Sequence, residues 1–159
     1  RNAKVITESV MKLNKLFMDS SALMAGILSA EGGARALLLL SEIDKIDLVV
    51  SEQVITEVER NIARKAPKLL PFARELVLQA KITILIDPKP EILKDRTDWI
   101  SHIADLPILA AAADAHVDFL VTLNTKHFMD DPQVAKRSGL HIGTPGDALA
   151  WLRKKFPND

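Results

Sequence analysis

Cysteine and tyrosine are absent from this chain of 159 residues, and aromatic residues make up only 4% of it. Without cysteine, the chain can form neither disulfides nor thiolate metal sites. This absence fits a cytoplasmic protein in a reducing compartment. The low aromatic content argues against a surface on which single-stranded bases stack.

An excess of charge is also absent, because 21 Lys and Arg residues balance 21 Asp and Glu residues. Global electrostatics therefore give no indication of a nucleic-acid partner, and a polyanion would have to meet a local basic patch or a bound metal ion. No apolar run reaches transmembrane length, and the first residues do not resemble a signal peptide, so we expect no membrane partner.

Several catalytic motifs are missing as well. The glycines form neither a dinucleotide fingerprint nor a phosphate-binding P-loop, and no Gly-x-Ser-x-Gly elbow occurs. An aspartyl-phosphate phosphatase would carry Asp-x-Asp, whereas Asp19 is followed by two serines. The histidines lack zinc-ligand spacing, so we expect surface or hydrogen-bonded side chains. These histidines are His102, His116, His127 and His141.

What the chain does contain is an alternation of short apolar runs with helical patterns. Strands are predicted over 16–18, 46–50, 82–86, 119–122 and 139–142. Helices are predicted over 4–14, 22–30, 34–43 and 52–65, after Pro71, within 87–101, from Asp105, over 129–138 and from Thr144. This order predicts an α/β fold, a three-layer α/β/α sandwich with a central parallel sheet of about four to five strands. We expect a helical extension over residues 1–15 and one domain over 16–159.

Two of these segments are predicted to be buried. Residues 82–86 are β-branched and continuously apolar, which is typical of a buried parallel strand. Residues 34–43 are nearly all Ala and Leu, which predicts a deeply buried helix.

Polar side chains follow two of the predicted strands directly. Asp19 ends the first strand, and Thr122 and Asn124 end the fourth, while Asp105 begins a helix beside them. In open α/β sheets, ligands bind outside the carboxyl ends of the strands. Clustered carboxylates need a compensating cation, and Mg²⁺ or Mn²⁺ would suit phosphodiester hydrolysis. The alternative is that Asp19 only caps the next helix, and this stretch alone leaves both interpretations open.

The helix predicted over 52–65 carries both acidic and basic candidates. Its helical wheel does not distinguish among the glutamates Glu52, Glu57 and Glu59. The densest basic cluster of the chain begins on it and comprises Arg60, Arg64, Lys65 and Lys68. The functional interpretation is phosphate binding, and the alternative is a solvated helix face.

Five blocks together resemble the PIN domain, the PilT N-terminus-like nuclease family. Each block alone is weakly specific, but they occur in order and at compatible spacing from Leu16 onwards. The blocks are Phe17-Met18-Asp19-Ser20-Ser21, Val50-Ser51-Glu52 through Glu57, Asp105-Leu106 through Ala112, Val121-Thr122-Leu123-Asn124 with Phe128, and Ile142-Gly143-Thr144-Pro145.

The resemblance implies a Mg²⁺- or Mn²⁺-dependent ribonuclease whose metal ligands are Asp19, Glu57 and Asp105. It implies supporting roles for the hydroxyls of Ser21 and Thr122 near the metal or the substrate phosphate. Asn124 stands where many members carry a fourth catalytic Asp. A neutral oxygen ligand there implies weaker binding of a second metal ion.

The resemblance also implies a homodimer and often a small antitoxin protein that blocks the site, as in VapC-like toxins. We therefore predict an endoribonuclease acting on RNA, the toxin of a toxin–antitoxin pair, with Arg60 and Arg64 supporting the substrate beside Glu57. One alternative is a PIN-like RNA- or protein-binding module that has lost catalysis, which Asn124 and the neutral charge favour. Another is a metal-dependent phosphatase on a similar sheet.

Overall fold

The computed structural model describes residues 12–156, and the helix predicted over 4–14 falls mostly outside them. Residues 12–14 are not helical and lead directly into the first strand. The strands are β1 (Lys15–Met18), β2 (Asp47–Ser51), β3 (Thr83–Leu85), β4 (Phe119–Val121) and β5 (Ile142–Gly143). All five lie within one or two residues of the predicted strands, except that β5 is shorter.

These strands form one parallel sheet in the order β3-β2-β1-β4-β5, as predicted for the fold class. The chain moves outward from β1 to β2 and β3, then returns to the other side of β1 to form β4 and β5. The strand order therefore reverses at β1 and β4, which makes the carboxyl ends of these two strands the topological switch point. Leu16, Phe17 and Met18 of β1 are fully buried.

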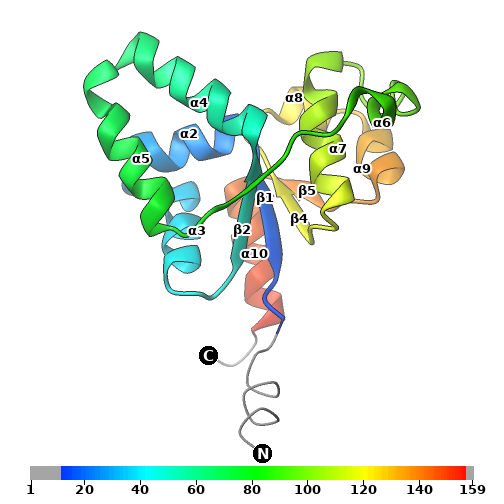
Figure 1. Cartoon of the computed structure of the whole chain (residues 1–159). Helices are drawn as coiled ribbons and strands as arrows, with labels where there is room; N and C mark the ends of the chain where they lie inside the picture. Colours follow the sequence, from blue (N-terminus) through cyan, green and yellow to red (C-terminus); the bar gives the residue numbers. More distant parts are fainter. Residues whose placement is uncertain (1–11, 157–159) are drawn as a thin grey trace, which may run out of the picture.

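Helices cover both faces of the sheet (Figure 1). On one side lie α2 (Ser20–Leu28), α3 (Gly33–Glu42), α4 (Glu52–Lys65) and α5 (Leu70–Gln79), with the 3₁₀ turn Pro67–Leu69 between the last two; α10 (Pro145–Lys155) packs against α3. On the other side lie α6 (Pro90–Lys94), α7 (Leu106–Asp114), α8 (Thr125–Phe128) and α9 (Pro132–Ser138), and the 3₁₀ turn Ile103–Asp105 precedes α7.

The prediction that the third strand is buried is wrong. β3 is an edge strand, and the side chains of Ile84 and Ile86 are 47% and 84% exposed. A continuously apolar run shows that a strand can be buried on both faces, but the position in the sheet depends on the crossover that follows. Here that crossover carries the chain past β2 and β1 to β4, so no further strand of the described residues pairs with the outer edge of β3.

The prediction that the helix over 34–43 is deeply buried holds for only one face of α3. Leu37 and Leu38 are buried, but Leu39 and Ile43, at the C-terminal end, are more than half exposed. The helix packs against α2, α10 and β2, and these contacts leave Leu39 and Ile43 largely exposed. No single described helix is long and apolar enough to cross a membrane; only the sharply bent pair of α2 and α3 reaches that length and apolarity together.

Candidate functional site

Asp19 ends β1 at the switch point, and only 3% of its surface is exposed. Its Oδ1 accepts hydrogen bonds from the backbone N–H of Ala22 at 2.9 Å and from the hydroxyl of Ser21 at 2.7 Å. Its Oδ2 accepts a hydrogen bond from the hydroxyl of Thr122 at 2.5 Å. Asp19 therefore caps α2, and the same carboxylate lies where the fold is expected to place a ligand.

The hydroxyls of Ser21 and Thr122 also connect Asp19 to the backbone that follows β4. Ser21 Oγ accepts the N–H of Leu123 and Thr122 Oγ1 accepts the N–H of Asn124, both at 2.9 Å. Each hydroxyl thus donates to the carboxylate and accepts from a peptide group. This arrangement fixes the rotamer of Asp19 and joins the carboxyl ends of β1 and β4.

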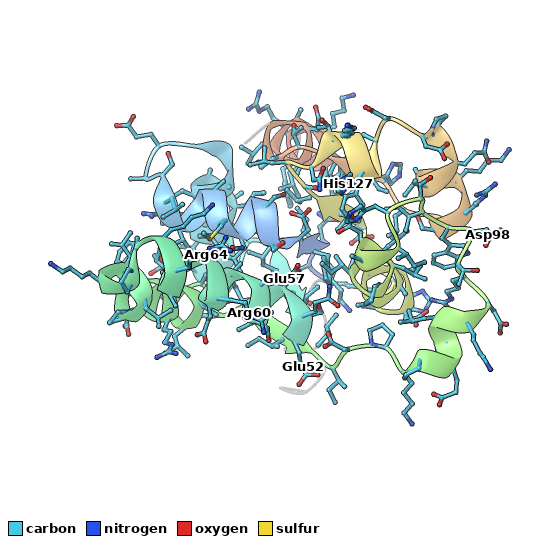
Figure 2. All side chains as sticks on the ribbon, turned by 90° about the horizontal axis from the view of Figure 1, so that it is seen from above. Glu52, Glu57, Arg60, Arg64, Asp98 and His127 are labelled. Carbon is cyan, nitrogen blue, oxygen red and sulfur yellow. The ribbon has the colours of Figure 1, made fainter. Side chains whose placement is uncertain are left out.

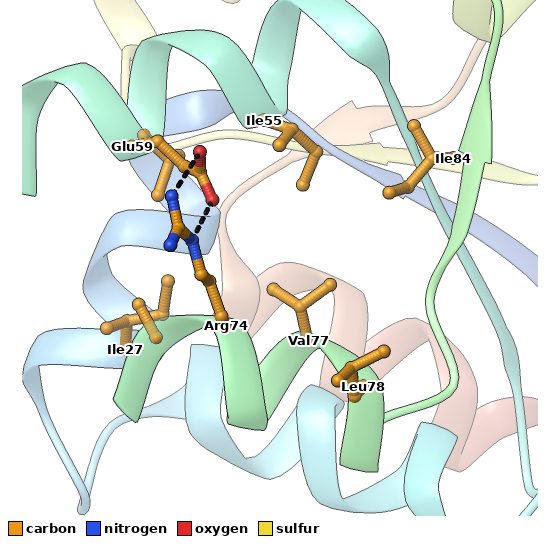
Figure 3. A pocket seen from close by; sticks show the side chains of 9 residues that line it. Ile27, Ile55, Glu59, Arg74, Val77, Leu78 and Ile84 are labelled. Atoms are coloured by element: carbon orange, nitrogen blue, oxygen red, sulfur yellow. Dashed lines mark hydrogen bonds and ion pairs between the residues drawn. The ribbon is translucent and has the colours of Figure 1, made fainter. Parts of the chain in front are cut away.

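The structure distinguishes the three glutamates of α4, which the helical wheel left equivalent. Both oxygens of Glu59 accept from Arg74, at 2.8 and 3.4 Å, and this pairing holds the pKa of Glu59 below its usual value (Figure 3). Glu52 Oε1 accepts the backbone N–H of Asp87 at 3.0 Å. Glu57 Oε1, in contrast, is buried and has no hydrogen-bond partner among the described residues.

The carboxylates of this site destabilise each other's charged forms. Burial raises the pKa of Asp19, three hydrogen bonds oppose this change, and the charge of Asp105 adds to it. The pKa of Glu57 is also raised, first by burial and then by the charges of Asp105 and, to a smaller extent, Asp19, while the polar side chains of Gln53 and Ser20 oppose this change. Asp19, Glu57 and Asp105 are therefore close enough to repel one another.

Asp105 stands at the N-cap position of α7, but its backbone is already helical and its side chain makes no capping bond. Its Oδ2 instead lies 3.0 Å from Nδ1 of His102 and 2.8 Å from Nδ1 of His127. The two imidazole rings stack with centroids 4.0 Å apart and planes 19° apart. Both histidines are hydrogen-bonded side chains, as expected, and the group they contact is a carboxylate of the candidate site.

Asn124 reaches the same cluster from the end of β4. It caps α8, since its Oδ1 accepts the N–H of His127 at 3.4 Å. Its Nδ2 lies 2.8 Å from Nδ1 of His127. Asn124 thus contacts His127 directly, and His127 in turn contacts Asp105.

Arg60 and Arg64 lie on α4 one and two turns beyond Glu57, and both side chains are exposed (Figure 2). Arg64 donates to Oδ1 of Asn61 at 2.8 Å. Among the described residues, no hydrogen bond or ion pair joins either arginine to Asp19, Glu57 or Asp105. The arginines therefore flank the carboxylates without belonging to their contacts.

This set of side chains fits a hard divalent cation. It offers carboxylate oxygens from three elements. Asp19 lies at the end of β1, Glu57 on α4, and Asp105 at the end of the 3₁₀ turn before α7. Oε1 of Glu57 is a ligand atom that no group among the described residues satisfies. A divalent charge would stabilise the charged forms of Asp19 and Glu57, which burial and then mutual repulsion disfavour, as their raised pKa values indicate.

A family model described as PIN domain matches residues 15–126. The chain belongs to the PIN domain family. This PIN domain also resembles a chain of the solved structure described as VapBC2 from Rickettsia felis bound to a DNA fragment from their promoter, with a TM-score of 0.58 and 16% identity. The match covers 82% of this chain and 98% of that chain, and it shows that the fold is shared. No curated protein matches this PIN domain.

Sequence reasoning missed His127 as a neighbour of Asp105. The two residues are 22 positions apart, and only the return of the chain through β4 brings them together. One local signal was present: His127 follows Asn124 by three residues, the spacing at which a residue in the first turn of a helix contacts its cap. For His102 the local signal is its position three residues before Asp105 in the chain.

Proposed function

We propose that this PIN domain is a Mg²⁺- or Mn²⁺-dependent endoribonuclease and the toxin of a toxin–antitoxin pair. The observation that carries the nuclease proposal is the buried Oε1 of Glu57, which has no hydrogen-bond partner in residues 12–156 and lies near two other carboxylates at the switch point. A stable fold rarely leaves such an atom unsatisfied without a functional reason.

In this proposal Asp19, Glu57 and Asp105 hold the ion, which when bound supplies positive charge at the scissile phosphate and a more acidic water. Ser21 and Thr122 keep the Asp19 carboxylate in one orientation through their hydrogen bonds. A fixed ligand orientation matters because misplacement by about 1 Å can reduce a rate about 100-fold. Asn124 contributes a neutral amide at the fourth position.

Arg60 and Arg64 supply the local positive charge that the chain as a whole lacks. They form a row one and two turns beyond Glu57 on α4 (Figure 2), and Lys65 and Lys68, which follow in the chain, are also exposed. Such a row can contact successive phosphates of one RNA strand without reading its bases. RNA binding by this row is expected to weaken as salt is raised.

The toxin assignment rests on the PIN fold together with its similarity to a chain of the VapBC2 structure. It implies an antitoxin protein that covers the carboxylates, and a homodimer. Production of the chain in bacterial cells is expected to arrest growth, whereas production of Asp19→Asn is not. Equal growth with both proteins would argue against the toxin role without touching the nuclease proposal.

A binding module without catalysis is the second candidate, and the neutral amide of Asn124 is the observation that favours it. The two functions are separated by incubating the protein with single-stranded RNA, structured RNA, single-stranded DNA and a phosphomonoester, each with Mg²⁺, Mn²⁺ or chelator. A nuclease cuts RNA internally with metal only. Turnover of the phosphomonoester alone would indicate a phosphatase, and retention of RNA without cutting would indicate the binding module.

A further inference from the structure

We propose that His102, Asp105 and His127 form a second cation site, which takes a first-row transition-metal ion such as Mn²⁺ in preference to Mg²⁺. This site shares Asp105 with the three-carboxylate site, and to that extent the inference rests on the proposed function. What it adds is a pair of nitrogen ligands, and with them a preference for the kind of metal.

The geometry of the cluster already resembles a ligand shell. One ligand atom from each of the three residues lies within 4.8 Å of the others. The Nδ1 atoms of His102 and His127 lie 3.0 and 2.8 Å from the same Asp105 oxygen. Metal–ligand bonds of about 2.1 Å at right angles would hold neighbouring ligand atoms about 3.0 Å apart, so these contacts need little change to surround an ion.

With the Asn124 amide oriented to cap α8, Nδ1 of His127 cannot satisfy both of its polar neighbours. Nδ1 of this imidazole has either one proton or one lone pair. It lies 2.8 Å from the Nδ2 donor of Asn124 and also 2.8 Å from the Oδ2 acceptor of Asp105. If Nδ1 accepts a hydrogen bond from Asn124, its lone pair and the Asp105 oxygen are two acceptors facing each other. If Nδ1 instead donates to Asp105, its N–H and the Asn124 Nδ2 group are two donors facing each other. A cation between Nδ1 and Oδ2 removes this conflict once the Asn124 amide turns its oxygen towards the ion.

The three side chains are also accessible and well anchored. The exposed fractions of their side chains are 51% for His102, 17% for Asp105 and 29% for His127, so an ion can enter from solvent. Asp105 stands at the start of α7, His102 precedes the 3₁₀ turn, and His127 is on α8. The stacked rings restrict each other's rotation.

Ligand chemistry determines which ion this cluster prefers. Mg²⁺ binds oxygen ligands almost exclusively, whereas imidazole nitrogens suit transition metals. Two nitrogens and one carboxylate oxygen therefore favour a first-row transition-metal ion over Mg²⁺, and Mn²⁺ is the member of that group that can also occupy an oxygen-rich site. The oxygen-only set of Asp19, Glu57 and Asp105 has no such preference.

The test measures Mn²⁺ binding by the full chain with two methods. Calorimetry gives the number of bound ions and their affinity, and pulsed electron paramagnetic resonance detects nitrogen bound to Mn²⁺. We expect nitrogen coupling in the wild-type protein and a stoichiometry that falls from two ions to one in His127→Gln. His102→Gln should lower the affinity of the second ion by at least about tenfold. His141→Gln, which changes an exposed histidine outside the cluster, should behave like the wild type.

Absence of Mn²⁺ binding, absence of nitrogen coupling, or coupling that persists unchanged in both His102→Gln and His127→Gln would overturn the second site. These results are independent of RNA cleavage. Cleavage that requires Asp19 but occurs without nitrogen coupling would remove the inference and keep the nuclease. Nitrogen-bound Mn²⁺ in a protein that cuts no RNA would keep the second cation site and remove the nuclease proposal.

Discussion

The hydroxyl of Thr122 donates a 2.5 Å hydrogen bond to Oδ2 of Asp19, although the two residues are 103 positions apart in the chain. Both side chains are buried, and each stands at the carboxyl end of a central strand. This bond connects β1 and β4 at the switch point. It also makes the orientation of the first proposed metal ligand depend on the correct register of the sheet.

Removal of this hydroxyl should therefore destabilise the fold. Thr122→Val keeps the shape of the side chain but leaves a buried oxygen of Asp19 without a donor, which should lower the free energy of unfolding by about 1–3 kcal/mol. Urea denaturation measures this change. Thr122→Ser retains the hydroxyl and should lose clearly less stability than the valine variant. If both variants lose the same amount, packing of the methyl group, and not the hydrogen bond, is what stabilises this position.

The raised pKa values of Asp19 and Glu57 predict how stability depends on pH when metal is removed. Both are raised from ordinary values of 3.8 and 4.5. The folded protein therefore binds these protons more tightly than the unfolded chain, and stability should fall as the pH rises from about 4 through the raised pKa values. Melting curves in chelator across this range measure the effect.

The variant Asp19→Asn isolates the contribution of one carboxylate. Asn remains a good helix cap and cannot ionise, so in chelator near pH 7 the variant should melt at a higher temperature than the wild type and depend less on pH. Asp44→Asn, which changes an exposed aspartate paired with Lys81, serves as the matched control and should not be stabilised. A lower melting temperature for Asp19→Asn would show that its hydrogen bonds outweigh the repulsion.

Metal binding should reverse this repulsion. Mg²⁺ at 100 times its dissociation constant for the three-carboxylate site should stabilise the wild-type protein by about 2.7 kcal/mol, because it binds the folded chain. Glu57→Gln should respond much less, while Glu75→Gln, which changes an exposed glutamate on α5, should respond fully. Thermal denaturation with and without Mg²⁺ measures the three responses. An equal shift in all three proteins would place the ion elsewhere.

The proposed phosphate contacts of α4 should affect RNA binding more than chemistry. The double variant Arg60→Gln with Arg64→Gln should raise KM for RNA by roughly tenfold, leave kcat nearly unchanged and reduce the salt dependence of binding. Arg153→Gln on α10 is the control for a lost surface charge. Steady-state cleavage measured at several salt concentrations distinguishes the double variant from this control. A fall in kcat with constant KM would assign these arginines to the reacting phosphate instead.

The sequence predicted the parallel sheet and the position of Asp19 well, because strand length, helix alternation and cap residues are local signals. It did not predict that β3 lies at an edge or that one side of α3 is exposed. Apolar composition reports what a segment tolerates, and the neighbours that cover it are determined by the whole topology. The exposed Ile86 and Leu39 show this difference.

The candidate site was predictable to a different extent for each residue. Asp19 and Thr122 follow from their places after strands, whereas Glu57 could be selected only by resemblance to the family. The structure adds a physical reason for that choice, because Glu59 is hydrogen-bonded to Arg74 and Glu52 to the backbone N–H of Asp87. His127 could not be selected, because its contact with Asp105 exists only in the folded chain.

The most direct test of the central claim is the rate of internal RNA cleavage as a function of Mn²⁺ concentration. The wild type is compared with Asp19→Asn, Glu57→Gln and Asp105→Asn, each verified as folded by circular dichroism. We expect saturable, metal-dependent cleavage by the wild type and a loss of about 100-fold or more in every variant. Cleavage by the wild type that persists in chelator, or that survives in all three variants, would contradict a metal site built from these carboxylates.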